Sequence, residues 1–224
     1  EFTPADYDLS IKWMNKAAEI AKQKNVRTFI KIHTSTGQSN EKYGNFNLLP
    51  QFASPEVGIL PHTVFFYELN AEVAPMYGNK NFHHIRDFML QEKDKRPTWY
   101  YPETSYYCVM DIDVPIYFTD YLLTRAKDTK YLYDNGINGQ LNFSTGQEVG
   151  YWLFDWNYAL MNNLDYNFDP YIGLKLIGED TSEWKKILDF QHKHFALNGL
   201  AGIISFSSLG DELIPGLHNV HKRN

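Results

Sequence analysis

Four titratable side chains stand at the ends of stretches that have the composition of β-strands. The four segments that we predict to be strands finish near His33, Glu68, Glu103 and Glu148. In parallel barrels the functional residues gather where strands end and loops begin. Imidazole and carboxyl groups that meet at such an edge can exchange protons. The spacing therefore predicts an acid–base site.

Aromatic residues surround two of these carboxylates. The segment 99–107 reads Trp-Tyr-Tyr-Pro-Glu-Thr-Ser-Tyr-Tyr, with Glu103 at its centre. Glu148 lies within Gly-Gln-Glu-Val-Gly-Tyr-Trp, and Asp155 and Trp156 follow shortly after it. Sugar rings present apolar C–H faces edged by hydroxyl groups, and aromatic rings beside carboxylates complement both features. Burial among such rings also raises the pKa of a carboxyl group towards the range of a general acid.

Helices and strands alternate along most of the chain. Strands are predicted at 26–33, 63–69, 96–101 and 139–144. Helices are predicted at 8–24, 81–92, 113–134, 148–162 and 181–194. The helix over 113–134 has Pro115 in its first turn and Gly136 just past its end. The segment 34–61 is predicted to be a long loop, which in a compact domain usually carries function or covers something.

This alternation predicts an α/β fold built from parallel βα units. Four such units are too few for a closed eight-stranded barrel. They match the C-terminal half of a (β/α)8 barrel, with the rest outside this sequence, or a compact open sheet. The glycine motifs of nucleotide binding, G-x-G-x-x-G and G-x-x-x-x-G-K-[ST], are absent from the sequence. We expect a βα-repeat domain over 1–168 and a C-terminal helical extension over 169–224 that packs on it.

Composition excludes several classes of partner. The net charge is −6 and the 21 Lys and Arg residues are scattered, which argues against nucleic acid. The single cysteine, Cys108, excludes an intrachain disulfide and a cysteine-based metal site. No apolar run approaches the roughly 20 residues that span a membrane. The compartment stays open, and a processed fragment of a secreted or lumenal protein is one interpretation of the opening Glu-Phe-Thr-Pro.

With glutamates at strand ends flanked by Trp and Tyr, residues 28–162 resemble the TIM-barrel glycoside hydrolases. The resemblance implies a carbohydrate substrate, with Glu103 and Glu148 as the acid and the base or nucleophile, and it implies neither a cofactor nor a metal. The supporting acids or substrate ligands that it implies are Glu68, Asp111, Asp113 and Asp155. The other substrate-binding residues that it implies are His33, Trp99, Tyr101, Tyr106, Gln147 and Trp152. The sequence departs from several such families because no Asn-Glu pair ends a strand.

Two other functions remain open. The first is a non-catalytic carbohydrate-binding or assembly protein whose Tyr and Trp residues form a contact surface. Half a barrel exposes apolar strand edges, so such a protein needs an oligomeric partner or its missing N-terminal half. The second is a metal-dependent hydrolase that uses His33 and Glu68. Convergence of Glu103 and Glu148 on one cleft would distinguish the glycosidase from the binding protein.

Overall fold

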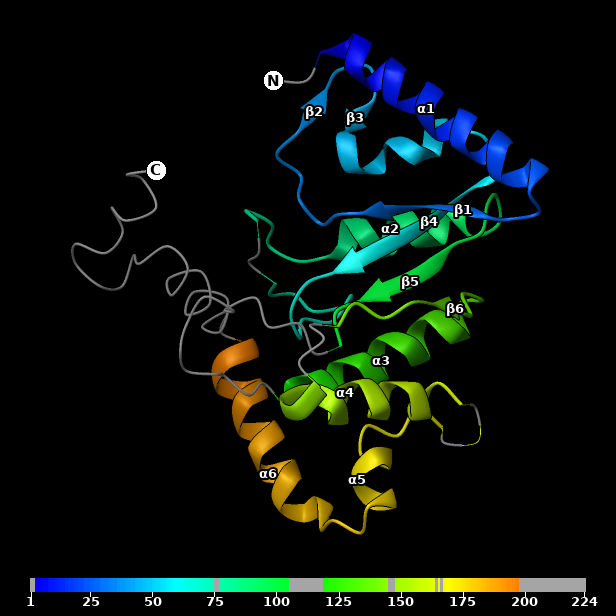
Figure 1. Cartoon of the computed structure of the whole chain (residues 1–224). Helices are drawn as coiled ribbons and strands as arrows, with labels where there is room; N and C mark the ends of the chain where they lie inside the picture. The colour runs from blue at the N-terminus through cyan, green and yellow to red at the C-terminus, as the bar shows by residue number, and fades with distance from the viewer. Residues whose placement is uncertain are drawn as a thin grey trace.

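A computed structural model of the chain describes residues 3–197, except 75–76, 105–118, 145–147, 164 and 166. It shows an α/β fold around a four-stranded parallel sheet in the order β1-β4-β5-β6 (Figure 1). These strands are β1 (Thr28–Ile32), β4 (Val57–Thr63), β5 (Trp99–Pro102) and β6 (Gly139–Gln140). A hairpin and a 3-10 helix connect β1 to β4, namely β2 (Ser39–Asn40), β3 (Gly44–Asn45) and η1 (Phe46–Phe52).

Seven helices are described besides η1. They are α1 (Pro4–Gln23), α2 (His83–Glu92), α3 (Asp120–Asp134), α4 (Glu148–Met161), α5 (Ile172–Leu176), α6 (Thr181–Gln191) and the π-helix η3 (His192–Ala196). α1 begins with a capping box, in which the Thr3 N–H donates to the Asp6 carboxylate at 2.7 Å. Within the described part of the chain, no helix is both long enough and apolar enough to cross a membrane.

One face of the sheet is buried against α2 and α3. Side chains alternate between the two faces of a strand, and those of Ile30, Ile59 and Tyr100 point to this side. They pack against Phe88 of α2 and Leu132 of α3. In Figure 1, α2 lies behind the strands, and α3 runs beside β6. Apolar burial of this kind stabilises a fold by about 25 cal/mol per Å².

The opposite face carries aromatic rings and few aliphatic side chains. We call it the aromatic face and define it by alternation as Phe29, Lys31, Gly58, Leu60, His62, Trp99, Tyr101 and Gly139. The rings of Phe29 and Trp99 lie 4.6 Å apart between centroids. Each ring covers a glycine, because a Cβ added to Gly58 would meet the Phe29 ring at 2.6 Å, and one added to Gly139 would meet Trp99 at 2.0 Å.

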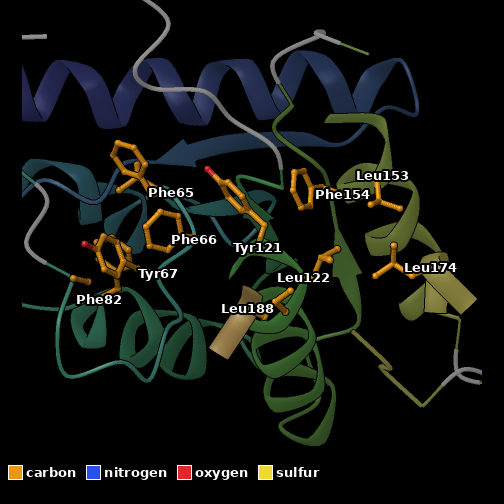
Figure 2. Packing of buried hydrophobic residues seen from close by; sticks show 12 residues of the cluster. Phe65, Phe66, Tyr67, Phe82, Tyr121, Leu122, Leu153, Phe154, Leu174 and Leu188 are labelled. Atoms are coloured by element: carbon orange, nitrogen blue, oxygen red, sulfur yellow. The ribbon is translucent and has the colours of Figure 1, made fainter. Parts of the chain in front are cut away.

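A second core joins the loop after β4 to the helices from α3 onward. Phe66 and Tyr67 of this loop share it with Tyr121 of α3 and Phe154 of α4 (Figure 2). Leu174 of α5 and Leu188 of α6 complete it. The C-terminal helices are therefore packed on the same side chains that bury the loop.

The strand predicted over 63–69 is wrong. β4 spans Val57–Thr63, inside the segment predicted to be a loop, and Val64 to Leu69 form a buried irregular turn. Phe65 adopts the left-handed region (φ 56°), which no strand residue does. The run Val64 to Tyr67 is apolar because its side chains fill the second core. Its backbone does not pair with any described strand.

Most other elements confirm the predictions. The strands at 26–33, 96–101 and 139–144 and the helices at 8–24, 81–92 and 148–162 are present within a few residues of the predicted bounds. The helix predicted over 113–134 is described from Asp120, and Pro115 lies outside the described residues. It ends at Asp134, and Gly136 follows with φ 81°. The cap of the last predicted helix is Asp180 in place of Thr181 or Ser182.

Candidate functional site

Three titratable side chains from neighbouring strands of the sheet meet at its carboxyl edge. His33 follows β1, His62 is the sixth residue of β4, and Glu103 follows β5. The rings of His33 and His62 are stacked with centroids 6.1 Å apart. His62 Nε2 lies 3.2 Å from Glu103 Oε1. With Lys31, Tyr101 and Phe143 these residues form what we call the carboxyl-edge cluster.

The hydrogen bonds of His62 fix where its proton lies. Its Nδ1 is 3.0 Å from the Tyr101 carbonyl oxygen, which can only accept, so Nδ1 carries a hydrogen. The other ring nitrogen, Nε2, lies 3.2 Å from Glu103 Oε1. The imidazole and the carboxyl group are therefore within hydrogen-bond distance, and we call them the His62–Glu103 couple.

Glu103 also closes the turn that follows β4. Its second oxygen, Oε2, accepts a hydrogen bond from the Phe65 N–H. Phe65 has a left-handed backbone, which costs a non-glycine residue on the order of 1–3 kcal/mol unless its surroundings hold it there. The Glu103 side chain is only 1% exposed, and both of its oxygens are engaged. Its position is therefore set by two strands and a turn together.

His33 is a neutral imidazole at neutral pH. Its Nδ1 accepts a hydrogen bond from the Ser35 N–H at 3.2 Å, so the ring hydrogen is on Nε2. Partial burial lowers the pKa of His33 to about 4, and positive charge on His62 and Lys31 acts in the same direction. Tyr77 packs against the ring with centroids 4.7 Å apart. His33 therefore offers one N–H donor beside the His62–Glu103 couple.

Lys31 adds an ammonium group above aromatic rings. Its Nζ lies 4.6 Å from the centroid of the Phe143 ring and 5.5 Å from that of Tyr101. The strand ladder brings Phe143 here, because its N–H donates to the Pro102 carbonyl at 2.9 Å and it forms a parallel bridge with Glu103. The carboxyl edge thus combines a cation, two rings and the imidazole–carboxyl couple.

The two predicted site residues on β5, Trp99 and Tyr101, have different surroundings. Tyr101 belongs to the carboxyl-edge cluster and is half-buried. Partial burial raises the pKa of its phenol, and the negative charge of Glu103 adds to the rise. Trp99 lies two residues earlier and packs on Phe29 over Gly139. It supports the aromatic face and does not reach the cluster.

The Asp155 side chain on α4 is hydrogen-bonded to residues that follow β5 and β6. Its carboxylate accepts hydrogen bonds from the hydroxyl groups of Thr104 and Ser144. Thr104 directly follows Glu103, so Asp155 positions the chain next to the cluster. Trp152, also on α4, is 46% exposed, and its ring lies 5.6 Å from that of Trp156.

Glu68 lies in a different part of the molecule. Its Oε2 is 3.0 Å from Lys127 Nζ of α3. It lines a cavity of about 250 Å³ together with Asp120, Thr124 and His192. His33 and Glu68 are therefore not brought together. No three His, Cys, Asp or Glu side chains in the described ranges are grouped so that they could hold a metal ion.

Several predicted residues fall outside the described part. Glu148 is the first residue of α4, and its side chain is not among those described. Tyr106, Asp111, Asp113 and Gln147 also lie outside the described residues. The separation of the Glu103 and Glu148 carboxyl groups therefore stays a prediction.

Sequence reasoning missed His62, Lys31 and Phe143. His62 ends the apolar run Val57 to Leu60 in the same way that His33 ends the first strand, and this parallel was the available signal. Comparison of the chain with protein families, with curated proteins and with solved structures finds no match.

Proposed function

We propose that this chain is a glycoside hydrolase-like domain that acts on a glycan at the carboxyl edge of its parallel sheet. The observation that carries the proposal is the convergence of His33, His62 and Glu103 from consecutive strands beside the rings of Tyr101 and Phe143. Parallel α/β enzymes assemble their sites at this edge. An aromatic ring offers a sugar an apolar platform, while the imidazole and ammonium groups donate hydrogen bonds to its hydroxyls.

In this proposal Glu103 and Glu148 are the pair of carboxyl groups that glycoside hydrolysis requires. His62 Nε2 lies 3.2 Å from Glu103 Oε1, so His62 would be placed to return a proton to Glu103 after each turnover. Lys31, His33 and Tyr101 are exposed enough to touch a sugar directly, whereas Glu103 is 1% exposed. Contact between Glu103 and a glycosidic oxygen therefore requires the side chains above it to move when the ligand binds.

The parallel sheet also supports the proposal that these units are the C-terminal half of a (β/α)8 barrel. Its strands follow one another in chain order, as barrel strands do, and the order does not reverse as in a doubly wound sheet. Phe29, Trp99 and Tyr101 of the aromatic face would then line the barrel interior. A further half-barrel, or an oligomeric partner, would pair with β1 and β6.

One observation favours a second function, a non-catalytic glycan-binding domain. Both oxygens of Glu103 are engaged and its side chain is buried, which suits a carboxylate that positions its neighbours. In this case the exposed Lys31 and the half-buried His33 and Tyr101 would bind the sugar, and no bond would be cleaved.

A glycan array followed by hydrolysis assays on the bound glycans tests both functions. If the domain is a hydrolase, Glu103→Gln should lower kcat at least 10³-fold while the variant still binds its glycan. Product analysis by mass spectrometry would measure the loss. If the wild-type chain binds glycans without cleaving them, the binding function replaces the catalytic one. If it binds none, the glycan proposal is wrong.

A further inference from the structure

Lys31 presents an ammonium group that forms no ion pair with a carboxylate in the described part of the chain. Among the described residues it forms neither an ion pair nor a hydrogen bond, and its contacts are with the rings of Phe143 and Tyr101. Cation–π contacts orient an ammonium group without using its N–H donors. Three N–H groups of Lys31 therefore stay available to a ligand.

Lys31 supplies the ammonium group of the cluster in an acidic protein. His33 is neutral at neutral pH because its pKa is about 4. The ammonium group of Lys31 is therefore the cation that the cluster offers to a ligand, whereas the whole chain has a formal net charge of −6.

Partial burial strengthens the attraction of this site for an anion. It lowers the pKa of Lys31, against the opposing effect of the Glu103 carboxylate, because the ammonium group is partly removed from water. An anionic group that binds to Nζ restores that lost interaction. The rings of Tyr101 and Phe143 lie beside this ammonium group and hold it at the site where an anionic group would bind.

We propose that the glycan bound at the carboxyl-edge cluster is anionic, and that Lys31 binds its carboxylate or sulfate group. This inference rests on the proposed glycan function and names its substrate class. Uronic acids and sulfated sugars present the same chemistry, a compact oxyanion on a sugar ring. His33 would donate its Nε2 hydrogen to a neighbouring hydroxyl group of the same sugar.

Calorimetric titration with matched ligands tests the inference. We would titrate the chain with an oligouronate, with its carboxyl-reduced neutral form and with a sulfated form of that neutral oligosaccharide. We expect at least one anionic form to bind ten times or more tightly than the neutral form. The stronger of the two anionic forms identifies the source of the oxyanion.

Variants then assign the preference to Lys31. Lys31→Gln should abolish the difference between anionic and neutral forms, and Lys31→Arg should keep most of it. Lys12→Gln removes the same charge from an exposed position on α1 and should leave binding unchanged, which controls for net charge. Circular dichroism of each variant checks that it is folded.

The outcomes separate this inference from the proposal on which it rests. If no form binds, the glycan function itself is wrong. If the neutral form binds as tightly as both anionic forms, or if Lys31→Gln keeps the preference, only the assignment of an anionic ligand to Lys31 is overturned.

Discussion

At the scale of single residues, Glu103 joins three parts of the fold. Its two oxygens join the end of β5 to His62 of β4 and to the backbone of Phe65. A buried charged group that loses its partner destabilises a fold more than an exposed one does, because the group left behind is not solvated. The stability of the turn after β4 and the geometry of the candidate site therefore depend on the same carboxylate.

We predict that Glu103→Ala lowers the free energy of unfolding by about 3 kcal/mol, because it leaves His62 unpaired and the Phe65 N–H without an acceptor. Glu103→Gln keeps an acceptor for Phe65 and should cost roughly 1 kcal/mol. Urea-induced unfolding measures both values. Equal losses for the two variants would show that the hydrogen bond to Phe65 contributes nothing.

His33 gives a prediction about pH. Its pKa in the folded state is about 4, below the ordinary value of 6.5, so the unfolded chain binds this proton more tightly. The contribution of His33 to stability is therefore complete above pH 6.5 and is lost as the pH falls towards 4. An NMR titration of the His33 ring should show the lowered pKa, and Lys31→Gln should raise it slightly by removing a neighbouring charge. A value near 6.5 in the wild-type protein would contradict the burial of this ring.

At the scale of elements, α3 is joined to the turn after β4 by buried charges. Arg125 donates from Nη2 to the carbonyl oxygens of Phe65 and Tyr67 at 3.0 and 2.7 Å. Its Nη1 pairs with Asp128 Oδ2 at 3.0 Å. Asp128 Oδ1 accepts from the Leu69 N–H at 2.7 Å. The turn is thus held at both ends by one helix.

Replacing Arg125 should unfold this region more readily and change its pH dependence. Burial raises the pKa of Asp128 to about 6, and Arg125 is the strongest influence that opposes the rise. Because the folded state binds this proton more tightly, the group lowers stability as the pH rises from about 4 to about 6. Arg125→Met should cost about 3–5 kcal/mol and extend this window above pH 6. Chemical denaturation from pH 4 to 8 would measure both effects.

The matched control is Arg86→Met on α2, whose side chain is 22% exposed and pairs with Asp87. It should change the unfolding free energy by less than about 1 kcal/mol. A similar loss in both arginine variants would contradict a special role for the α3 pairs.

The aromatic face predicts the effect of glycine substitutions. A methyl group at Gly139 would meet the Trp99 ring at 2.0 Å, so Gly139→Ala must displace that ring. We expect a loss of about 1–3 kcal/mol and a red-shifted Trp fluorescence. Gly37→Ala, where nothing lies within 4 Å of the added carbon, is the control and should be nearly neutral. A tolerated Gly139→Ala would show that Trp99 has room to move.

The sequence predicts elements well where local pattern and tertiary role agree. β1 and α4 are predictable because β-branched residues and helical spacing describe them fully. β4 is not, because Pro61 argues against a central strand and the turn after it is more apolar than the strand itself. The same error concealed His62, whereas His33 and Glu103 directly follow strands that the pattern locates correctly.

At the scale of the whole molecule, α6 is attached to α3 across a long stretch of chain. Gln191 accepts hydrogen bonds from the Thr119 N–H and hydroxyl at 2.8 and 2.9 Å. His192 Nδ1 lies 3.1 Å from Asp120 Oδ1. Burial raises the pKa of Asp120, and the hydrogen bond to Asp120 raises that of His192. Lys127 and Glu68 are the other charged groups that act on this pair.

The attachment of α6 to α3 should therefore weaken as the pH rises. A raised histidine pKa contributes stability below pH 6.5 that is lost as the pH rises through the folded-state value. Hydrogen exchange of α6 should be slower at pH 6 than at pH 8, after correction for the intrinsic rate. Asp120→Asn should remove most of this difference and lower the pKa of His192. Unchanged protection in the variant would mean that Leu188 and the apolar core alone hold the helix.

The order of the strands has a consequence for how the protein is made. Each strand of the four-stranded sheet pairs with the one that precedes it in that sheet along the sequence, so no strand has to enter between two that are already paired. A ribosome delivers the chain in this same order and takes roughly ten seconds to progress from β1 to β6. Each newly synthesised unit can add to a finished edge, and α6 arrives after Thr119 and Asp120 are in place. We expect the sheet to assemble during translation, from its amino-terminal strand onward.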